Sequence, residues 1–196
     1  MRGFEQIPWL YDTLFDFFDW RGMGKWRLWL AKGARGRTLE VGCGTGRNLP
    51  LYPQGVQLTG IEPSPDTLAR ASKRSPGTPL VRASAEALPF RDNSFDTVVA
   101  SLVFCSVDQP DVGLAEIRRV LRDNGTLRMI EHVREKKRWR ARLQDFIQPA
   151  WTWAAGGCRN NRDTETTVQA AGFEIEPDGR REVDTFRRFA AHKQAR

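Results

Sequence analysis

A short apolar segment that runs directly into three closely spaced glycines constrains the fold of this chain more than any other feature. Residues 38–41 read TLEV, which is typical of a buried β-strand, and residues 42–46 read GCGTG. Glycines at the turn after a first strand let a ligand approach the backbone and its free N–H groups. Arginine stands at position 47, where the dinucleotide fingerprint G-x-G-x-x-G requires a third glycine. The loop therefore predicts a ligand site at the end of a strand, but not a typical dinucleotide site.

Two acidic residues accompany this loop. Glu40 lies two residues before the first glycine, and Glu62 ends a second apolar segment, residues 56–61. An acid at the end of the second strand, about 20 residues after the loop, is where such folds bind ribose hydroxyls. The loop contains no lysine for a phosphate. Two carboxylates without such a lysine favour a ligand with ribose hydroxyls and a cationic centre over a pyrophosphate.

Strand and helix patterns alternate along most of the chain. Ser64 and Pro65 are typical of a helix start, as the N-cap and the first helical residue. Residues 95–102 form an apolar run of the kind that is buried in a parallel sheet. The alternation indicates βαβ units, and hence an α/β fold with helices on both faces of a parallel sheet. The patterns predict strands over residues 38–41, 56–61, 80–81, 95–102, 126–131, 173–175 and 185–191, and helices over residues 47–52, 64–74, 111–121, 136–155 and 163–171.

Composition is that of an ordinary globular protein. Of the 196 residues, 40% are hydrophobic and 28% charged, which excludes a disordered chain. We expect one domain over residues 1–196: an aromatic-rich helical cap in 1–34, a ligand-binding half in 35–132, and further helices and closing strands in 133–196. Three scattered cysteines indicate a reduced, cytoplasmic protein, and the sequence suggests neither a secretory leader nor a membrane span. The net charge of +7 permits nucleic acid, anionic lipid or acidic small molecules as partners and selects none of them.

Four segments follow one another in a distinctive order. They are residues 40–46 (EVGCGTG), residues 60–64 (GIEPS), residues 85–96 (AEALPFRDNSFD) and residues 119–125 (RVLRDNG). Together they resemble the successive motifs of the class I S-adenosylmethionine-dependent methyltransferases. The resemblance implies a Rossmann-like, doubly wound sheet of seven strands, mostly parallel, with the last strand antiparallel. It also implies an enzyme that uses S-adenosylmethionine as its methyl donor.

The resemblance further implies where that donor binds. Its ribose is expected on Glu62, its adenine near Ala85, and its methionine part near Glu40 and Ser101, with Tyr11 closing over it from the N-terminal helix. Serine stands at position 84, where many relatives carry an aspartate that meets the adenine amino group. The donor-binding residues that the resemblance implies are Tyr11, Glu40, Gly42, Cys43, Gly44, Gly46, Asn48, Glu62, Pro63, Ser84, Ala85, Glu86, Ser101 and Leu102.

The segment after the fourth expected strand bears on the methyl acceptor. Residues 102–107 read LVFCSV, so the Asn/Asp-Pro-Pro-aromatic motif of many nucleobase and planar-amine methyltransferases is absent there. Together with residues 131–133 (EHV) and the later Gly157-Cys158, the segment resembles the alkyl-thiol methyltransferases of animals and their bacterial small-molecule relatives. This resemblance implies a small, partly lipophilic acceptor such as an alkyl thiol. Phospholipid N-methyltransferases, which act on phosphatidylethanolamine, and quinone-type C-methyltransferases use similar scaffolds and stay open as alternatives.

His132 is the candidate catalytic residue. It follows an expected strand, at the edge where open α/β sheets bind their ligands. An imidazole at that edge can take a proton from the acceptor. The alternative is a hydrogen-bonded histidine with a structural role only. The sequence indicates no metal site.

Basic residues gather between positions 134 and 142. The default interpretation is a solvated helix face, and the alternative is peripheral contact with an anionic membrane. A nucleic-acid-binding module on the same fold is the non-enzyme alternative. It leaves the glycine loop and Glu62 without a purpose, so we expect no nucleic acid as a partner. The basic residues are Arg134, Lys136, Lys137, Arg138, Arg140 and Arg142.

Overall fold

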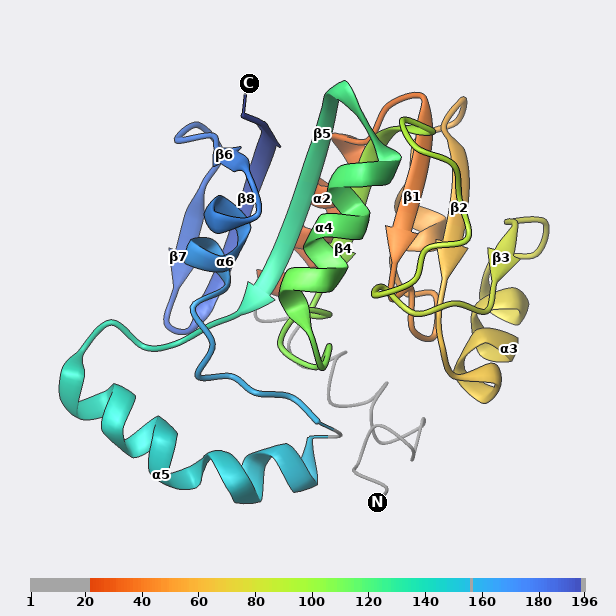
Figure 1. The fold of residues 1–196 in the computed structure, drawn as a ribbon. Helices are drawn as coiled ribbons and strands as arrows, with labels where there is room; N and C mark the ends of the chain where they lie inside the picture. The colour runs from red at the N-terminus through yellow and green to blue at the C-terminus, as the bar shows by residue number, and fades with distance from the viewer. Residues whose placement is uncertain (1–21, 156, 195–196) are drawn as a thin grey trace.

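One eight-stranded sheet organises the molecule (Figure 1). The structure is a computed structural model that describes residues 22–155 and 157–194. Seven strands follow the order β3-β2-β1-β4-β5-β8-β6, and β7 pairs with β8. The pairs among β1 to β5 are parallel, whereas β8 runs antiparallel to β5, β6 and β7. The strands are β1 (Arg37–Val41), β2 (Gln57–Ile61), β3 (Leu80–Val81), β4 (Phe95–Ser101), β5 (Leu121–His132), β6 (Phe173–Ile175), β7 (Arg181–Val183) and β8 (Phe186–Lys193).

Helices pack on both faces of this sheet, as Figure 1 shows. On one face, Leu114 and Ile117 of α4 belong to a buried cluster with Leu39 and Val98 of the central strands. On the other face, Leu30 of α2 packs in a second cluster, with side chains of β4 and β5. Strands covered on both faces are apolar throughout, which explains their continuous hydrophobic runs. The helices are α2 (Gly24–Lys32), the short 3-10 helix η3 (Leu49–Leu51), α3 (Pro65–Arg74), α4 (Pro110–Val120), α5 (Arg138–Ala154) and α6 (Thr164–Ala170).

The predicted α/β class and the mostly parallel sheet with an antiparallel edge are confirmed. The start of α3 is also as predicted, since the Ser64 side chain accepts the N–H of Thr67. Strand β7 was not predicted. It consists of three exposed residues, so it carries no buried apolar pattern by which a sequence reveals a strand.

Two predicted elements differ in the structure. The helix expected over residues 47–52 is reduced to the single turn η3, which ends at Tyr52, because the residue before a proline such as Pro53 favours extended backbone. The strand expected over residues 126–131 begins earlier, so Asn124-Gly125 lies inside the long strand β5. There Phe95 pairs with Leu121 but Thr97 pairs with Thr126, so residues 122–125 leave the regular register.

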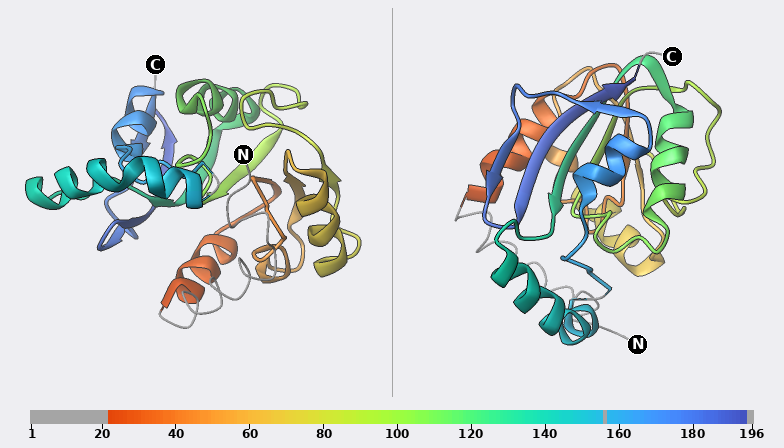
Figure 2. Two further views of the ribbon diagram at one scale, coloured as in Figure 1. Left: turned by 90° about the horizontal axis from the view of Figure 1, so that it is seen from below. Right: turned by 60° about the vertical axis from the view of Figure 1, so that its left-hand side comes forward.

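Helix α5 lies apart from the helices that cover the sheet. Figure 1 and the right-hand view of Figure 2 show it beyond the edge at which the parallel strands end. The helix spans 17 residues and includes Pro149. Within residues 22–155 and 157–194, no helix is long and apolar enough to cross a membrane.

Candidate active site

The carboxyl ends of the five parallel strands meet at one edge of the sheet, and most of the predicted site residues lie there. This is the edge at which open α/β sheets bind ligands. Gly44, in the loop after β1, has φ +57, and a Cβ added to it would meet nothing within 4 Å. Gly46 has φ +81, and its Cβ would lie 2.9 Å from the Cα of Ala71 in α3. The first of these glycines opens the backbone to a ligand, and the second lets the loop pack against α3.

Glu62, directly after β2, turns its carboxylate toward the glycine loop. Its Oε2 accepts the N–H of Gly44 at 3.2 Å, and its Oε1 accepts the N–H of Ser64 at 3.0 Å. Burial raises the pKa of Glu62, and these two backbone N–H groups act against that rise. The two hydrogen bonds fix the carboxylate between the loop and the start of α3, where ribose hydroxyls are expected.

Glu40 is fully buried at the end of β1 and belongs to a chain of polar contacts. Arg27 of α2 donates to Asn48 Oδ1 at 2.8 Å, and Asn48 Nδ2 donates to Glu40 Oε1 at 2.8 Å. Burial raises the pKa of Glu40 to about 7, although hydrogen bonds from Asn48 and Tyr52 and the charge of Arg27 lower it. The second oxygen, Oε2, makes no hydrogen bond of normal geometry within the described residues, although the buried Tyr52 hydroxyl lies close to this carboxylate.

Ser101, at the end of β4, presents a second buried polar atom of this kind. Its Oγ has no hydrogen-bond partner in the described part of the chain. A buried polar group without a partner costs free energy, so a ligand that satisfies it gains affinity. Glu40 Oε2 and Ser101 Oγ lie at the ends of the neighbouring strands β1 and β4. A ligand ammonium between these strand ends would supply the missing donors.

The expected adenine loop forms a compact turn. Ser84 Oγ donates to Glu86 Oε2 at 3.1 Å and accepts the N–H of Glu86 at 3.3 Å. Glu86 Oε1 in turn accepts the N–H of Gln109, at the start of α4. Ala85 is buried within this turn, and the carbonyl of Pro63 accepts from Arg82 Nε. Ser84 and Glu86 are thus engaged with one another, which fixes the loop that follows β3.

The loop that leaves β4 carries backbone strain. Leu102 has φ +59, a conformation that a bulky side chain rarely adopts. Beneath this loop lies the fully buried Glu131, whose Oε1 accepts the N–H groups of Val103 and Phe104 at 3.2 and 3.1 Å. Burial raises the pKa of Glu131 to about 8. Glu131 therefore holds the strained loop in place from the neighbouring strand.

His132 ends β5 in an aromatic and sulfur-containing environment. Its ring stacks on Phe186 with centroids 4.7 Å apart, and Trp151 of α5 approaches edge-on at 6.1 Å. Its Nε2 lies 2.8 Å from Thr185 Oγ1, and its Nδ1 lies 3.9 Å from the Sγ of Cys158. Both ring nitrogens therefore have partners.

Cys158 is the most acidic thiol of the described chain. A hydrogen bond from Cys105 is the largest cause that lowers its pKa, and contacts with His132 and Trp151 lower it further, against the effect of burial. Cys105 shows the opposite shift, since the Cys158 sulfur and burial raise its pKa well above the usual value. Burial and the nearby Glu40 and Glu62 carboxylates likewise raise the pKa of Cys43.

Several polar residues of this edge were not predicted from the sequence. Arg27 stands in an aromatic-rich segment and Thr185 in a predicted strand, so neither gave a signal. Glu131 was part of a quoted motif, but no role was assigned to it. The predicted Tyr11, and with it the first part of the expected helical cap, lies outside the described residues.

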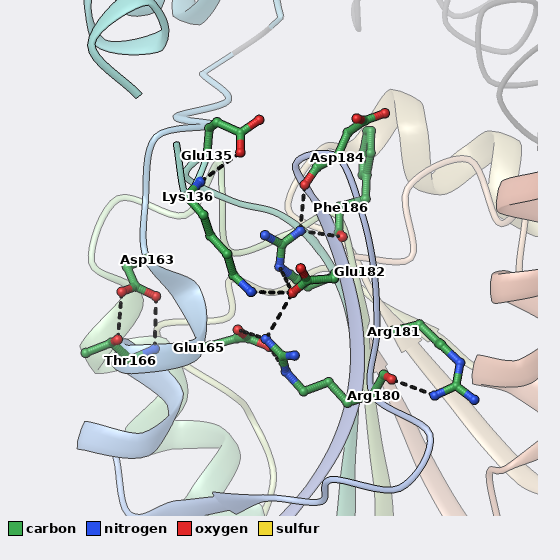
Figure 3. Close-up of polar contacts among 11 residues, drawn as sticks. Glu135, Lys136, Asp163, Glu165, Thr166, Arg180, Arg181, Glu182, Asp184 and Phe186 are labelled. Atoms are coloured by element: carbon green, nitrogen blue, oxygen red, sulfur yellow. Dashed lines mark hydrogen bonds and ion pairs between the residues drawn. The ribbon is translucent and has the colours of Figure 1, made fainter. Parts of the chain in front are cut away.

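A cavity of about 500 Å³ lies nearby, against the β7–β8 hairpin and α6. Its charged side chains pair with one another, as Figure 3 shows. Arg180 meets Glu165 at 2.7 Å, while Lys136 and Arg187 both meet Glu182. The cavity therefore has little unbalanced charge with which to attract a ligand, and the candidate site stays at the strand ends.

Comparison with known proteins reveals which family the chain resembles. Residues 39–129 match the family described as a methyltransferase domain. A solved structure of a SAM-dependent methyltransferase from Thermotoga maritima superposes with a TM-score of 0.72 and 25% identity, over 97% of this chain and 98% of that one. Residues 39–129 thus match a methyltransferase domain, and the chain as a whole resembles the class I methyltransferases. The methyl donor of this family is S-adenosylmethionine, and the partnerless atoms of Glu40 and Ser101, together with the Glu62 carboxylate, fit its ammonium and ribose groups.

Named relatives of this chain differ in their acceptors. The human thiol S-methyltransferase TMT1B is 36% identical over 151 residues, which are 72% of this chain and 62% of that protein. The phosphatidylethanolamine N-methyltransferase of Cereibacter sphaeroides is 40% identical over 108 residues, which are 52% of this chain and 53% of that protein. The chain thus spans about three fifths of the length of the thiol methyltransferases that it matches.

Proposed function

We propose that this methyltransferase transfers a methyl group from S-adenosylmethionine to a small, partly lipophilic thiol. The observation that carries the proposal is the set of side chains around His132, at the end of β5. There, one imidazole lies among Phe186, Trp151 and Cys158. Such surroundings suit an apolar acceptor with a single acidic proton. The names of the relatives that act on thiols support the same choice.

In the proposed reaction, S-adenosylmethionine supplies a methyl group on a sulfonium, which is already an excellent leaving group. The chain therefore has to align the acceptor, exclude water and receive one proton. Glu62 would hold the ribose, and Glu40 with Ser101 would hold the ammonium. The compact turn over residues 84–86 would flank the adenine. These contacts would fix the donor from the ends of four strands, β1 to β4.

His132 is the residue that we propose to receive the proton of the acceptor. The Thr185 hydroxyl can accept the N–H of Nε2, at 2.8 Å. This arrangement leaves the lone pair on Nδ1, the nitrogen that faces Cys158. A thiol that enters beside Cys158 would deliver its proton to Nδ1 as its sulfur attacks the methyl group.

Titration calorimetry with S-adenosylmethionine tests donor binding. We expect the wild type to bind, and we expect both Gly44→Val and Glu62→Ala to weaken binding at least about tenfold. Glu62→Ala loses one or two charge-assisted hydrogen bonds, and Gly44→Val places a side chain where the ligand approaches the loop, at a positive φ. Glu174→Ala, which removes an exposed acid on β6, is the matched control and should bind as the wild type does. Unchanged binding in both site variants would reject the site.

A labelled donor incubated with alkyl thiols, amines, quinols and phosphatidylethanolamine tests the acceptor. We expect label in the alkyl thiols, and we expect His132→Gln to lose most of that transfer while still binding the donor. Label that appears in phosphatidylethanolamine alone would establish the phospholipid alternative, which the 40% identical relative favours. Label in quinols alone would establish C-methylation.

We further propose that residues 1–196 act as one methyltransferase domain in the cytoplasm. The single sheet supports the first point, because its strands come from both halves of the chain. The three unpaired cysteines are consistent with the second.

A further inference from the structure

Helix α5 presents a row of exposed apolar side chains. Trp139, Leu143, Phe146 and Trp153 recur at spacings of four, three and seven residues, which places them on one face of the helix. Their exposed fractions are 65%, 53%, 84% and 64%, and Ile147 beside them is 43% exposed. We call these five residues the α5 stripe. Few soluble surfaces carry so many large apolar side chains in one row.

The opposite face of α5 attaches the helix to the protein. Ala141 and Gln144 are buried there, and Gln144 Nε2 donates to the carbonyls of Val133 and Asn160. Gln148 Nε2 likewise donates to the carbonyl of Cys158. The stripe therefore faces away from the body of the molecule, consistent with the separate position of α5 in Figures 1 and 2.

Arginines border the stripe on both sides. At 100° per residue, Arg138 and Arg142 lie along one border and Arg140 along the other. Asp145, the acidic residue of this helix, forms a bidentate ion pair with Arg134. Of the basic residues predicted to meet lipid, Arg134, Lys136 and Arg140 are engaged with acids, whereas Arg138 and Arg142 are exposed beside the apolar row.

We propose that the α5 stripe and its bordering arginines bind the surface of an anionic phospholipid bilayer. An apolar face of Trp, Phe and Leu, bordered by arginines, is the composition of helices that lie in the membrane interface. Trp139 and Trp153 lie near the two ends of the row, and tryptophan is enriched in membranes at the level of the headgroups. The inference rests on exposed residues of α5 and does not depend on the acceptor.

Sedimentation of the full-length protein with vesicles tests this surface. We expect binding to vesicles of equal parts phosphatidylglycerol and phosphatidylcholine, and much weaker binding to phosphatidylcholine alone. The double variant Leu143→Ser/Phe146→Ser should lose at least about tenfold in affinity, since both side chains leave the bilayer. Arg138→Gln/Arg142→Gln should lose about fivefold per arginine on the anionic vesicles.

Matched controls separate the stripe from general effects. Leu28→Ser/Val112→Ser removes two exposed apolar side chains from α2 and α4, and Arg70→Gln/Lys73→Gln removes two exposed charges from α3. Both controls should bind vesicles as the wild type does. A fluorophore on Phe146→Cys should shift to shorter wavelength on vesicles, and one on Val112→Cys should not. Thermal unfolding midpoints and donor binding should be unchanged in the stripe variants.

Three results would overturn the proposal. The first is a wild type that stays in solution with anionic vesicles, and the second is stripe variants that sediment as the wild type does. The third is a dimer, seen by gel filtration without vesicles, that Leu143→Ser/Phe146→Ser dissociates, which would make the stripe an interface between two copies. A wild type that binds vesicles but not S-adenosylmethionine would contradict the proposed function and would not contradict the membrane proposal.

Discussion

Glu40 shows how a binding group can oppose the stability of its own fold. A carboxyl group whose pKa rises on folding favours the folded state when it is protonated. For Glu40, with a pKa near 7 against an ordinary 4.5, this contribution is present below pH 4.5 and is lost as the pH rises to about 7. The unliganded protein therefore keeps a buried charge at neutral pH, and an ammonium of the donor would neutralise it.

Glu40→Gln is predicted to stabilise the unliganded protein at pH 8 while weakening donor binding. The gain in free energy of unfolding should be on the order of 2 kcal/mol at pH 8 and close to zero at pH 4.5. Glutamine can still accept from Asn48 through its side-chain oxygen. Urea unfolding at the two pH values measures the gain, and an equal effect at both would contradict the charge argument.

Cys158 is predicted to be the most reactive thiol of the protein. The hydrogen bond from Cys105 lowers its pKa, whereas the hydrogen bond to Cys158 raises the pKa of Cys105 and burial raises that of Cys43. Peptide mapping after brief iodoacetamide treatment should find Cys158 labelled at least about tenfold faster than the others. His132→Gln should slow this reaction, because the imidazole beside the sulfur is lost. Equal labelling of all three cysteines would disprove the prediction.

At the scale of single elements, the glycine loop depends on its fit against α3. Gly46 and Gly55 both adopt positive φ, at +81 and +92, but only Gly46 faces the backbone of α3 at close range. Gly55→Ala should cost about 1–2 kcal/mol from backbone strain alone. Gly46→Ala should cost a further 1–3 kcal/mol, roughly, because the added methyl group meets Ala71. Equal losses of unfolding free energy would show that the contact with α3 is unimportant.

Elements with strong local patterns were predictable, and those that depend on distant residues were not. The strands covered on both faces are recognisable in the sequence as continuous apolar runs, and Ser64-Pro65 marks the start of α3. The helix expected over residues 47–52 was wrong beyond one turn, because Tyr52, which precedes Pro53, is extended. In the site, motifs revealed Glu40 and Glu62, but the contact of Arg27 with Asn48 joins residues 21 positions apart. No local pattern encodes such a pair.

At the scale of the whole molecule, Arg128 connects α2 to the sheet. From β5 it donates to the carbonyls of Leu30 and Trp29, at the end of α2, and its guanidinium lies 3.9 Å from the Trp29 ring centroid. A cation that satisfies the last carbonyls of a helix stabilises that helix end. Arg128 thereby anchors the helix from which Arg27 reaches toward the donor site.

Arg128→Lys is predicted to destabilise the protein by about 2 kcal/mol, because a single ammonium cannot replace the planar fork over an aromatic ring. Donor affinity should fall as well, since Arg27 is then held less firmly. Arg91→Lys, at an exposed position, is the control and should leave both quantities unchanged. Urea unfolding and calorimetry measure the two effects, and a loss of stability without any loss of affinity would separate α2 from the donor site.

Helix α5 has one further consequence, because its inner side approaches His132 while its outer side points away from the protein. With that outer side resting on a bilayer, the entrance for the acceptor would open toward the lipid rather than toward bulk water. A lipophilic thiol would then arrive by lateral diffusion, at a local concentration fixed by its partition coefficient. Selectivity among thiols would follow how readily each dissolves in lipid as much as how well each fits the protein.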